Sequence, residues 1–348
     1  MSRLRPVLAA LTMLSGVTFS GAVLAGRLQD GMVAAKAGDY ATALKDWRPL
    51  AKQGNAKAQT LLGVLYAQGR GVPQDYTQAA YWWRLAARQG DAAARLGLGG
   101  LYVHGLGVSK DYTQAARWFR VAAKEGAAMA QFNLGALYGH GEGVPKSDVR
   151  AAYWWDRAAK QGYVRAQSGL GVLYEHGRGV PKDYTRAAYW WRLAAKQGDA
   201  VAQLGLGDLY VHGLSVPKDY TRAAFWFQLA AKQGLAAAQF DLGIAYVHGQ
   251  GVPKDYIQSA YWWRLAAKQG YVQAQSGLGG LYLAGEGVPQ DYVKAYMWLD
   301  LGAAGGNVLA QKGRDLVAAR MTRAQIAEGQ RLAEQFRPHS ATPRGRAR

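Results

Sequence analysis

Small and aromatic residues recur along this chain in a pattern that repeats every 36 residues, without an insertion or a deletion. In one copy the apolar residues stand at i, i+3, i+4 and i+7, the spacing of one buried helix face: Ala79, Trp82, Trp83 and Ala86. A second stripe with helical spacing follows after a glycine: Ala94, Leu98, Leu101 and Tyr102. Each copy therefore predicts two helices, A and B, and a period of this length is typical of a stacked solenoid.

Polar residues and glycines mark where these helices begin and end. Helix A is expected to start behind an aspartate that caps its free N–H groups, at Asp39, Asp75, Asp111, Asp183, Asp219, Asp255 and Asp291, with Ser147-Asp148 as the one departure. It is expected to end at a left-handed glycine, from Gly54 to Gly306 at constant spacing. A further glycine recurs in the middle of helix B, from Gly63 to Gly279, and predicts a close approach of neighbouring backbones.

All twelve tryptophans lie at two adjacent positions of helix A, from Trp47 to Trp298. A ligand-binding box would not need a copy in every repeat. We therefore expect these indoles to fill the space between neighbouring helices.

At these residues the chain resembles the Sel-one-like repeat (SLR) family, whose pattern is Ala-x-x-Trp-x-x-x-Ala-Ala-x-x-Gly followed by Ala-x-x-x-Leu-Gly-x-x-Tyr-x-x-Gly-x-Gly-Val. The resemblance implies an all-α fold, a right-handed α/α superhelical solenoid of two-helix, tetratricopeptide-like repeats, with A helices on the concave side. It also implies the work of an adaptor in signalling and envelope processes. Some cysteine-rich members are linked to penicillin binding or β-lactam hydrolysis, and these traits are not carried over because this chain has no cysteine.

The period divides the chain into five expected segments. Residues 1–25 form a signal peptide and residues 26–38 a capping helix. Residues 39–311 form about eight repeats. Residues 312–336 contain a C-terminal capping helix, preceded by the capping box of Thr322 and Gln325. Residues 337–348 are a basic tail that we expect to be disordered.

The signal peptide is expected from a basic start, an apolar run and a small-residue cleavage site. Arg3 and Arg5 precede the uncharged stretch of residues 7–24, and Val23-Leu24-Ala25 fits the cleavage site. An uncleaved membrane anchor is the alternative, although glycine and hydroxyl residues make the run weakly apolar. These features predict a periplasmic or secreted protein that has no membrane span after cleavage.

A third face of helix A carries aromatic and cationic side chains and is the predicted partner-binding surface. Its residues are Tyr81, Arg84, Arg88, Tyr153, Tyr189, Arg192, Lys196, Phe225, Tyr261, Arg264 and Lys268. The alternative is that the cations are solvated side chains near helix C-termini. Two copies place an acid, Asp156 or Asp300, where Arg84 stands, and Arg117 and Ser147 also break the pattern. Such departures would mark partner discrimination or mere drift between duplicates.

Catalytic and metal chemistry find little support in the sequence. Five histidines share one repeat position, which spaces them about 8–10 Å apart, too far for one zinc ion: His104, His140, His176, His212 and His248. No strand precedes the Gly-x-Gly loops, and the repeated aspartates serve as helix caps. We expect no catalytic residues, no metal and no cofactor.

The net charge of +19 favours acidic partners and disfavours self-association. The sequence therefore predicts a non-enzymatic, monomeric scaffold or adaptor of the bacterial envelope, which holds an acidic protein or peptide in a concave aromatic and basic groove. The alternatives are a cell-wall-directed enzyme of the penicillin-binding or β-lactam-hydrolysing type, and a binder of anionic glycan or lipopolysaccharide. Nucleic acid fits the charge, but we do not expect it to be the partner of an exported protein.

Overall fold

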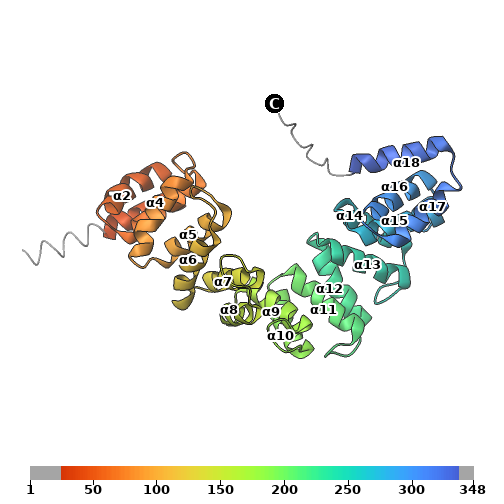
Figure 1. Ribbon diagram of the computed structural model, residues 1–348, viewed down its shortest axis with the longest axis horizontal. Coiled ribbons are helices and arrows are strands. Elements are labelled where there is room, and N and C mark those ends of the chain that lie inside the picture. The colour runs from red at the N-terminus through yellow and green to blue at the C-terminus, as the bar shows by residue number, and fades with distance from the viewer. Residues whose placement is uncertain (1–24, 337–348) are drawn as a thin grey trace, which may run out of the picture. The chain divides into compact units, whose positions relative to one another are not determined.

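The computed structural model describes residues 25–336, and all regular secondary structure in this range is helical (Figure 1). The described chain forms two compact units, one ending at Tyr163 and one beginning at Val164, and each is considered by itself. The predicted tail and all but the last residue of the predicted signal peptide lie outside the described residues.

Each repeat contributes a helix A of uniform length. These helices are α2 (Tyr40–Lys52), α4 (Tyr76–Arg88), α6 (Tyr112–Lys124), α8 (Asp148–Lys160), α10 (Tyr184–Lys196), α12 (Tyr220–Lys232), α14 (Tyr256–Lys268) and α16 (Tyr292–Ala304). We number the repeats 1 to 8 in this order.

Helix B follows in each repeat. These helices are α3 (Ala56–Gln68), α5 (Ala92–His104), α7 (Ala128–His140), α9 (Val164–His176), α11 (Ala200–His212), α13 (Ala236–His248), α15 (Val272–Ala284) and α17 (Val308–Ala318). Repeat 4 gives α8 to the first unit and α9 to the second. The predicted solenoid of 36-residue two-helix repeats is confirmed.

The predicted caps hold the ends of helix A. The carboxylate of Asp183, for example, accepts the backbone N–H groups of Thr185 and Arg186 at 2.9 Å, and Ser147 caps α8 through its hydroxyl. Gly198 follows the helix at a φ of +91°. Only glycine adopts this left-handed conformation at no steric cost, which explains its constant place.

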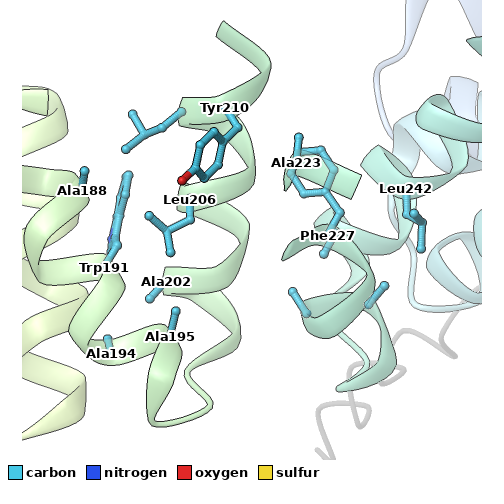
Figure 2. Packing of buried hydrophobic residues seen from close by; sticks show 14 of the residues in the cluster. Ala188, Trp191, Ala194, Ala195, Ala202, Leu206, Tyr210, Ala223, Phe227 and Leu242 are labelled. Atoms are coloured by element: carbon cyan, nitrogen blue, oxygen red, sulfur yellow. The ribbon is translucent and has the colours of Figure 1, made fainter. Parts of the chain in front are cut away.

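Alanine, leucine and aromatic side chains form the core between successive helices. In the second unit the core includes Trp191, Leu206, Phe227 and Leu242, all of them at most 4% exposed. Figure 2 shows Trp191, Leu206 and Tyr210 between α10 and α11, with Phe227 and Leu242 on the next pair of helices. The indoles thus fill the space between helices, as predicted.

The glycine in the middle of helix B faces a side chain rather than a backbone. A Cβ on Gly63, Gly135 or Gly243 would overlap the indole ring of the next helix A. That indole donates its Nε1–H to a carbonyl three residues before the glycine, as Trp263 does to Phe240 at 2.9 Å. A side chain rather than the expected backbone is thus the nearest neighbour, although at Gly135 and Gly279 a carbonyl oxygen of the next helix A also lies 3.2 Å from the Cβ position.

Helices at both ends cover the terminal repeats. Residues 25–36 are helical, and the carbonyl of Leu28 accepts the indole N–H of Trp47 at 3.2 Å, as a helix B carbonyl does elsewhere. Helix α18 (Arg323–Phe336) packs on α16, where Gln330 donates to the hydroxyl of Tyr296 at 3.3 Å. The backbone N–H of Thr322 donates to Gln325 Oε1 at 2.8 Å, which is the predicted capping box.

Candidate functional site

Half-exposed aromatic rings occupy one position of helix A in five repeats. Their exposed fractions lie between 50 and 55%: Tyr81, Tyr153, Tyr189, Phe225 and Tyr261. Each ring meets the next residue's indole edge to face, with centroids 5.0 Å apart for Tyr189 and Trp190. The packed indole fixes the ring beside it, so that one edge and much of one face remain open to solvent.

The last residue of helix A is an exposed lysine or arginine in every repeat but the last. The predicted Arg88, Lys196 and Lys268 are of this kind, and so are Lys52, Lys124, Lys160 and Lys232. A cation here is favoured by the helix dipole. The rings and these terminal cations together define what we call the helix A surface.

The three arginines predicted one turn before the terminal cation differ in their surroundings. Arg192 is exposed. Arg84 and Arg264 are half-buried, and their guanidinium groups donate to the hydroxyls of Tyr102 at 3.5 Å and Tyr282 at 3.2 Å in their own repeats. These two arginines therefore also tie helix A to helix B.

The two acids that replace Arg84 have cationic neighbours. Asp156 pairs with Lys160 at 2.6 Å, and Asp300 pairs with Arg314 at 3.1 Å. Asp156 and Lys160 also line an open hollow of about 470 Å³ together with Tyr153, Arg157 and the amides of two glutamines. In the first unit the helix A surface therefore carries both signs of charge.

A ladder of glutamines joins consecutive repeats, and sequence reasoning missed it. The Nε2 group of Gln233 donates to Gln203 Oε1 at 2.8 Å, and Gln203 in turn donates to the carbonyl of Ala195. Equivalent bonds join Gln89 to Gln59, Gln161 to Gln131, Gln197 to Gln167 and Gln269 to Gln239. The signal was visible, because both glutamines recur with the 36-residue period.

One rung of this ladder is ionic. Arg95 and Glu125 replace the two glutamines between repeats 2 and 3 and form a salt bridge, while Arg95 Nε also donates to the carbonyl of Ala87 at 3.2 Å. Because both glutamines are replaced together, a salt bridge joins these two repeats where a hydrogen bond between amides joins the others.

A pair of carboxylates lies between helices B of the second unit. Asp208 in α11 and Asp241 in α13 line a cavity of about 140 Å³ beside Phe227 and His212. Burial raises the pKa of Asp208 to about 6, with repulsion from Glu175 adding to it, and raises the pKa of Asp241 to about 7, with repulsion from Asp208. Asp208 replaces small or apolar residues of the other repeats, and Asp241 stands where they have glycine or leucine, except for Asn133 in repeat 3; sequence reasoning singled out neither acid.

Three of the five repeated histidines contact a carbonyl of their own helix. The Nδ1 atoms of His140, His176 and His212 lie 2.8, 3.0 and 2.9 Å from the carbonyl oxygen four residues earlier. Within residues 25–336 no group of three or more His, Asp or Glu side chains is arranged to hold a metal ion.

Seven stretches of the chain match the family model of the Sel1 repeat: residues 56–91, 91–126, 128–163, 164–199, 200–235, 236–271 and 272–307. Each runs from a helix B to the next helix A; the glycine of helix B meets a ring in the first six pairs and Leu299 in the last. Because the matches cover well over half of the chain, it belongs to the Sel1 repeat family. Members of this family bind protein partners and are generally scaffolds rather than enzymes.

Two solved structures show the same architecture. A Sel1 repeat protein from Oxalobacter formigenes is 34% identical and aligns with a TM-score of 0.65 over 82% of this chain and 88% of that one. A protective antigen present in uropathogenic Escherichia coli strains, which displays an SLR fold, is 28% identical, with a TM-score of 0.55 over 91% of this chain and 84% of that one. A search of curated proteins gives no match.

None of the helices in residues 25–336 has both the length and the apolar composition that a bilayer span requires.

Proposed function

We propose that this chain is a non-enzymatic adaptor that binds an acidic protein or peptide segment along its helix A surface. It acts after export, in the periplasm or outside the cell, as a monomer. The observation that carries this proposal is the half-exposed ring that five of the helices A present, with an exposed cation two turns further on, at the end of the same helix.

The chemistry of these side chains suits a peptide. Aromatic rings provide large, rigid contact area at low cost in conformational entropy, and Tyr, Trp and Arg are enriched at binding hot spots. Carboxylates of a partner would make charge-assisted hydrogen bonds with the lysines and arginines, and the net charge of +19 would accelerate the encounter. Export is supported by the basic start, apolar run and small-residue site in residues 1–25.

Other side chains hold the fold and leave this surface free. The indoles at the second aromatic position pack into the glycine notches, and the glutamine ladder joins the repeats at their edge. The rings and terminal cations have no comparable role in the packing, since they are exposed.

A binding titration tests the proposal. The probe is a fluorescein-labelled copolymer of Glu and Tyr, followed by fluorescence anisotropy with the mature protein. We expect wild-type protein to bind it and Arg192→Glu with Lys196→Glu to weaken binding about tenfold, equivalent to about 1.4 kcal/mol. The matched control reverses Lys312 and Arg320, two exposed cations near the end of the last repeat. Absence of wild-type binding, or an equal loss in both variants, overturns the assignment.

A further inference from the structure

A larger repeat underlies the 36-residue period. Residues 75–182 and 183–290 are two copies of a three-repeat block, identical at most positions. Departures from the short period confirm the relationship, because they recur 108 residues apart: Phe119 with Phe227, and Tyr163 with Tyr271. The two blocks therefore share their packing. Their helix A surfaces can be compared position by position, and the residues that differ are the ones that distinguish the two surfaces.

The ring position is complete in only one of the two blocks. In repeats 5 to 7 it holds Tyr189, Phe225 and Tyr261, each 50 to 55% exposed. In repeats 2 to 4 the middle ring is replaced by Arg117, which separates Tyr81 from Tyr153. Because α10, α12 and α14 hold the same place in consecutive repeats of one unit, their three rings form an uninterrupted row.

The charge also differs between the blocks. Helices α10, α12 and α14 contain no Asp or Glu, and each ends in an exposed lysine: Lys196, Lys232 and Lys268. Their capping aspartates lie at the opposite end of each helix, about 20 Å away along the axis. Two of these caps pair with arginines, Asp183 with Arg186 at 3.4 Å and Asp219 with Arg222 at 3.2 Å. At the lysine end, no acidic residue lies in the loops that follow α12 and α14, and the loop after α10 contains one, Asp199, which caps α11.

The counterpart surface in repeats 2 to 4 is also cationic, with Arg117, Arg120 and Arg157 beside the terminal cations, but it has carboxylates within it. Asp156 pairs with Lys160, the counterpart of Lys268, and stands where the other block has Arg264. Glu125 follows the last turn of α6 directly and is bound by Arg95. An acidic segment that approached this block would meet these carboxylates, and like charges at close range are repelled.

These differences assign the binding site to one block. We propose that an acidic peptide segment with interspersed apolar side chains lies across α10, α12 and α14 of repeats 5 to 7. Its carboxylates pair with Lys196, Lys232 and Lys268, and its apolar side chains pack against the three rings. This inference rests on the proposed function and adds to it which repeats bind and what sequence character the partner has.

The duplication provides the matched test. One variant carries Lys196→Glu, Lys232→Glu and Lys268→Glu, and the control carries Arg88→Glu, Lys124→Glu and Lys160→Glu at the counterpart positions. Both place the same charges in the same last turns, so any penalty from the helix dipole is shared. We expect the first variant to bind the Glu–Tyr copolymer at least tenfold more weakly than wild type and the control at most twofold more weakly. A milder variant with Gln at the three lysines should show a smaller loss of the same kind, should the reversal unfold the protein.

The possible outcomes separate the two proposals. Equal losses in both variants, or a larger loss in the control, overturn the assignment to repeats 5 to 7 but leave the proposed function intact. If wild-type protein does not bind the copolymer at all, both fail. Heparin is added as a competitor, and displacement of the copolymer by heparin at lower concentration than by unlabelled copolymer would overturn the peptide assignment in favour of an anionic glycan.

Discussion

Gly171, in the middle of α9, lies directly against the indole of Trp191 in α10, and Trp191 Nε1 donates to the carbonyl of Ser168 at 3.2 Å. The missing side chain and the ring are two halves of one contact. The ring is 2% exposed, and the hydrogen bond fixes its orientation. Van der Waals packing against the glycine and a hydrogen bond therefore both hold one repeat to the next. Because this buried contact stabilises the stack of repeats, the exposed side chains of helix A are available for binding a partner.

Replacing Gly171 by alanine should destabilise the protein. Alanine favours a helix over glycine by about 1 kcal/mol, but its methyl group would overlap the Trp191 ring. Overpacking of a buried contact typically costs about 1–3 kcal/mol, so we expect a net loss of up to about 2 kcal/mol. Urea unfolding followed by circular dichroism measures this as a lower midpoint.

Gly280 in α15 provides the control for this prediction. A Cβ at this helix position would meet nothing within 4 Å, so Gly280→Ala should raise the midpoint by the equivalent of about 0.5–1 kcal/mol. If both substitutions stabilise the protein, the notch is not a packing device and the account of the inter-repeat contact is wrong.

The Arg95–Glu125 pair should behave as a unit. Arg95 contacts both Glu125 and the carbonyl of Ala87, and the single amide of Arg95→Gln cannot replace both contacts, so we expect a loss of about 1 kcal/mol. Arg95→Gln with Glu125→Gln recreates the glutamine pair found between other repeats, such as Gln233 and Gln203. We expect the double variant to recover most of the lost stability.

A double-mutant cycle at low and high salt checks this coupling. The wild-type pair should weaken with added salt because it is ionic and partly exposed, whereas the glutamine pair should not. Additive effects of the two single substitutions would show that the two side chains do not interact.

Stability should increase as the pH falls from about 8 to about 5. The pKa values of Asp208 and Asp241 are raised in the folded protein to about 6 and about 7, so the folded state binds protons in this window that the unfolded state does not. The free energy of unfolding therefore rises on acidification and falls as the carboxylates ionise. Capping aspartates such as Asp291, whose pKa is lowered by its bonds to Lys294 despite the opposing effect of burial, act only at lower pH.

Asp208→Asn with Asp241→Asn isolates this effect from other contributions to the pH dependence of stability. The variant should have a higher melting temperature than wild type at pH 8 and a flatter dependence on pH. Equal slopes for the variant and wild type would show that the two carboxylates are not responsible.

Much of the fold follows from the sequence because its causes are local. The caps at Asp183 and Gly198 and the apolar stripe of helix A are each set within one helix, and a 36-residue period repeats them. Contacts between residues about 30 positions apart could not be derived in this way. Gln233 and Gln203 are both ordinary polar residues in sequence, and only the stacking of repeats makes them partners.

The candidate site shows the same limit. Position on a helix face predicted the exposure of Tyr189, Arg192 and Lys196. It did not predict that Arg84 and Arg264 would donate hydrogen bonds to tyrosines of helix B. A long side chain can reach several neighbours, and the pattern of one helix does not show which neighbours the next helix provides.

Hydroxyl-radical footprinting of the mature protein, with and without the Glu–Tyr copolymer, tests the central claim most directly. Half-exposed aromatic rings are readily oxidised, and mass spectrometry locates the products residue by residue. The account predicts that the copolymer protects Tyr189, Phe225 and Tyr261, while Met129 on helix B, 46% exposed, remains equally reactive. Unchanged oxidation of the three rings on binding, or protection confined to helix B residues, would contradict it.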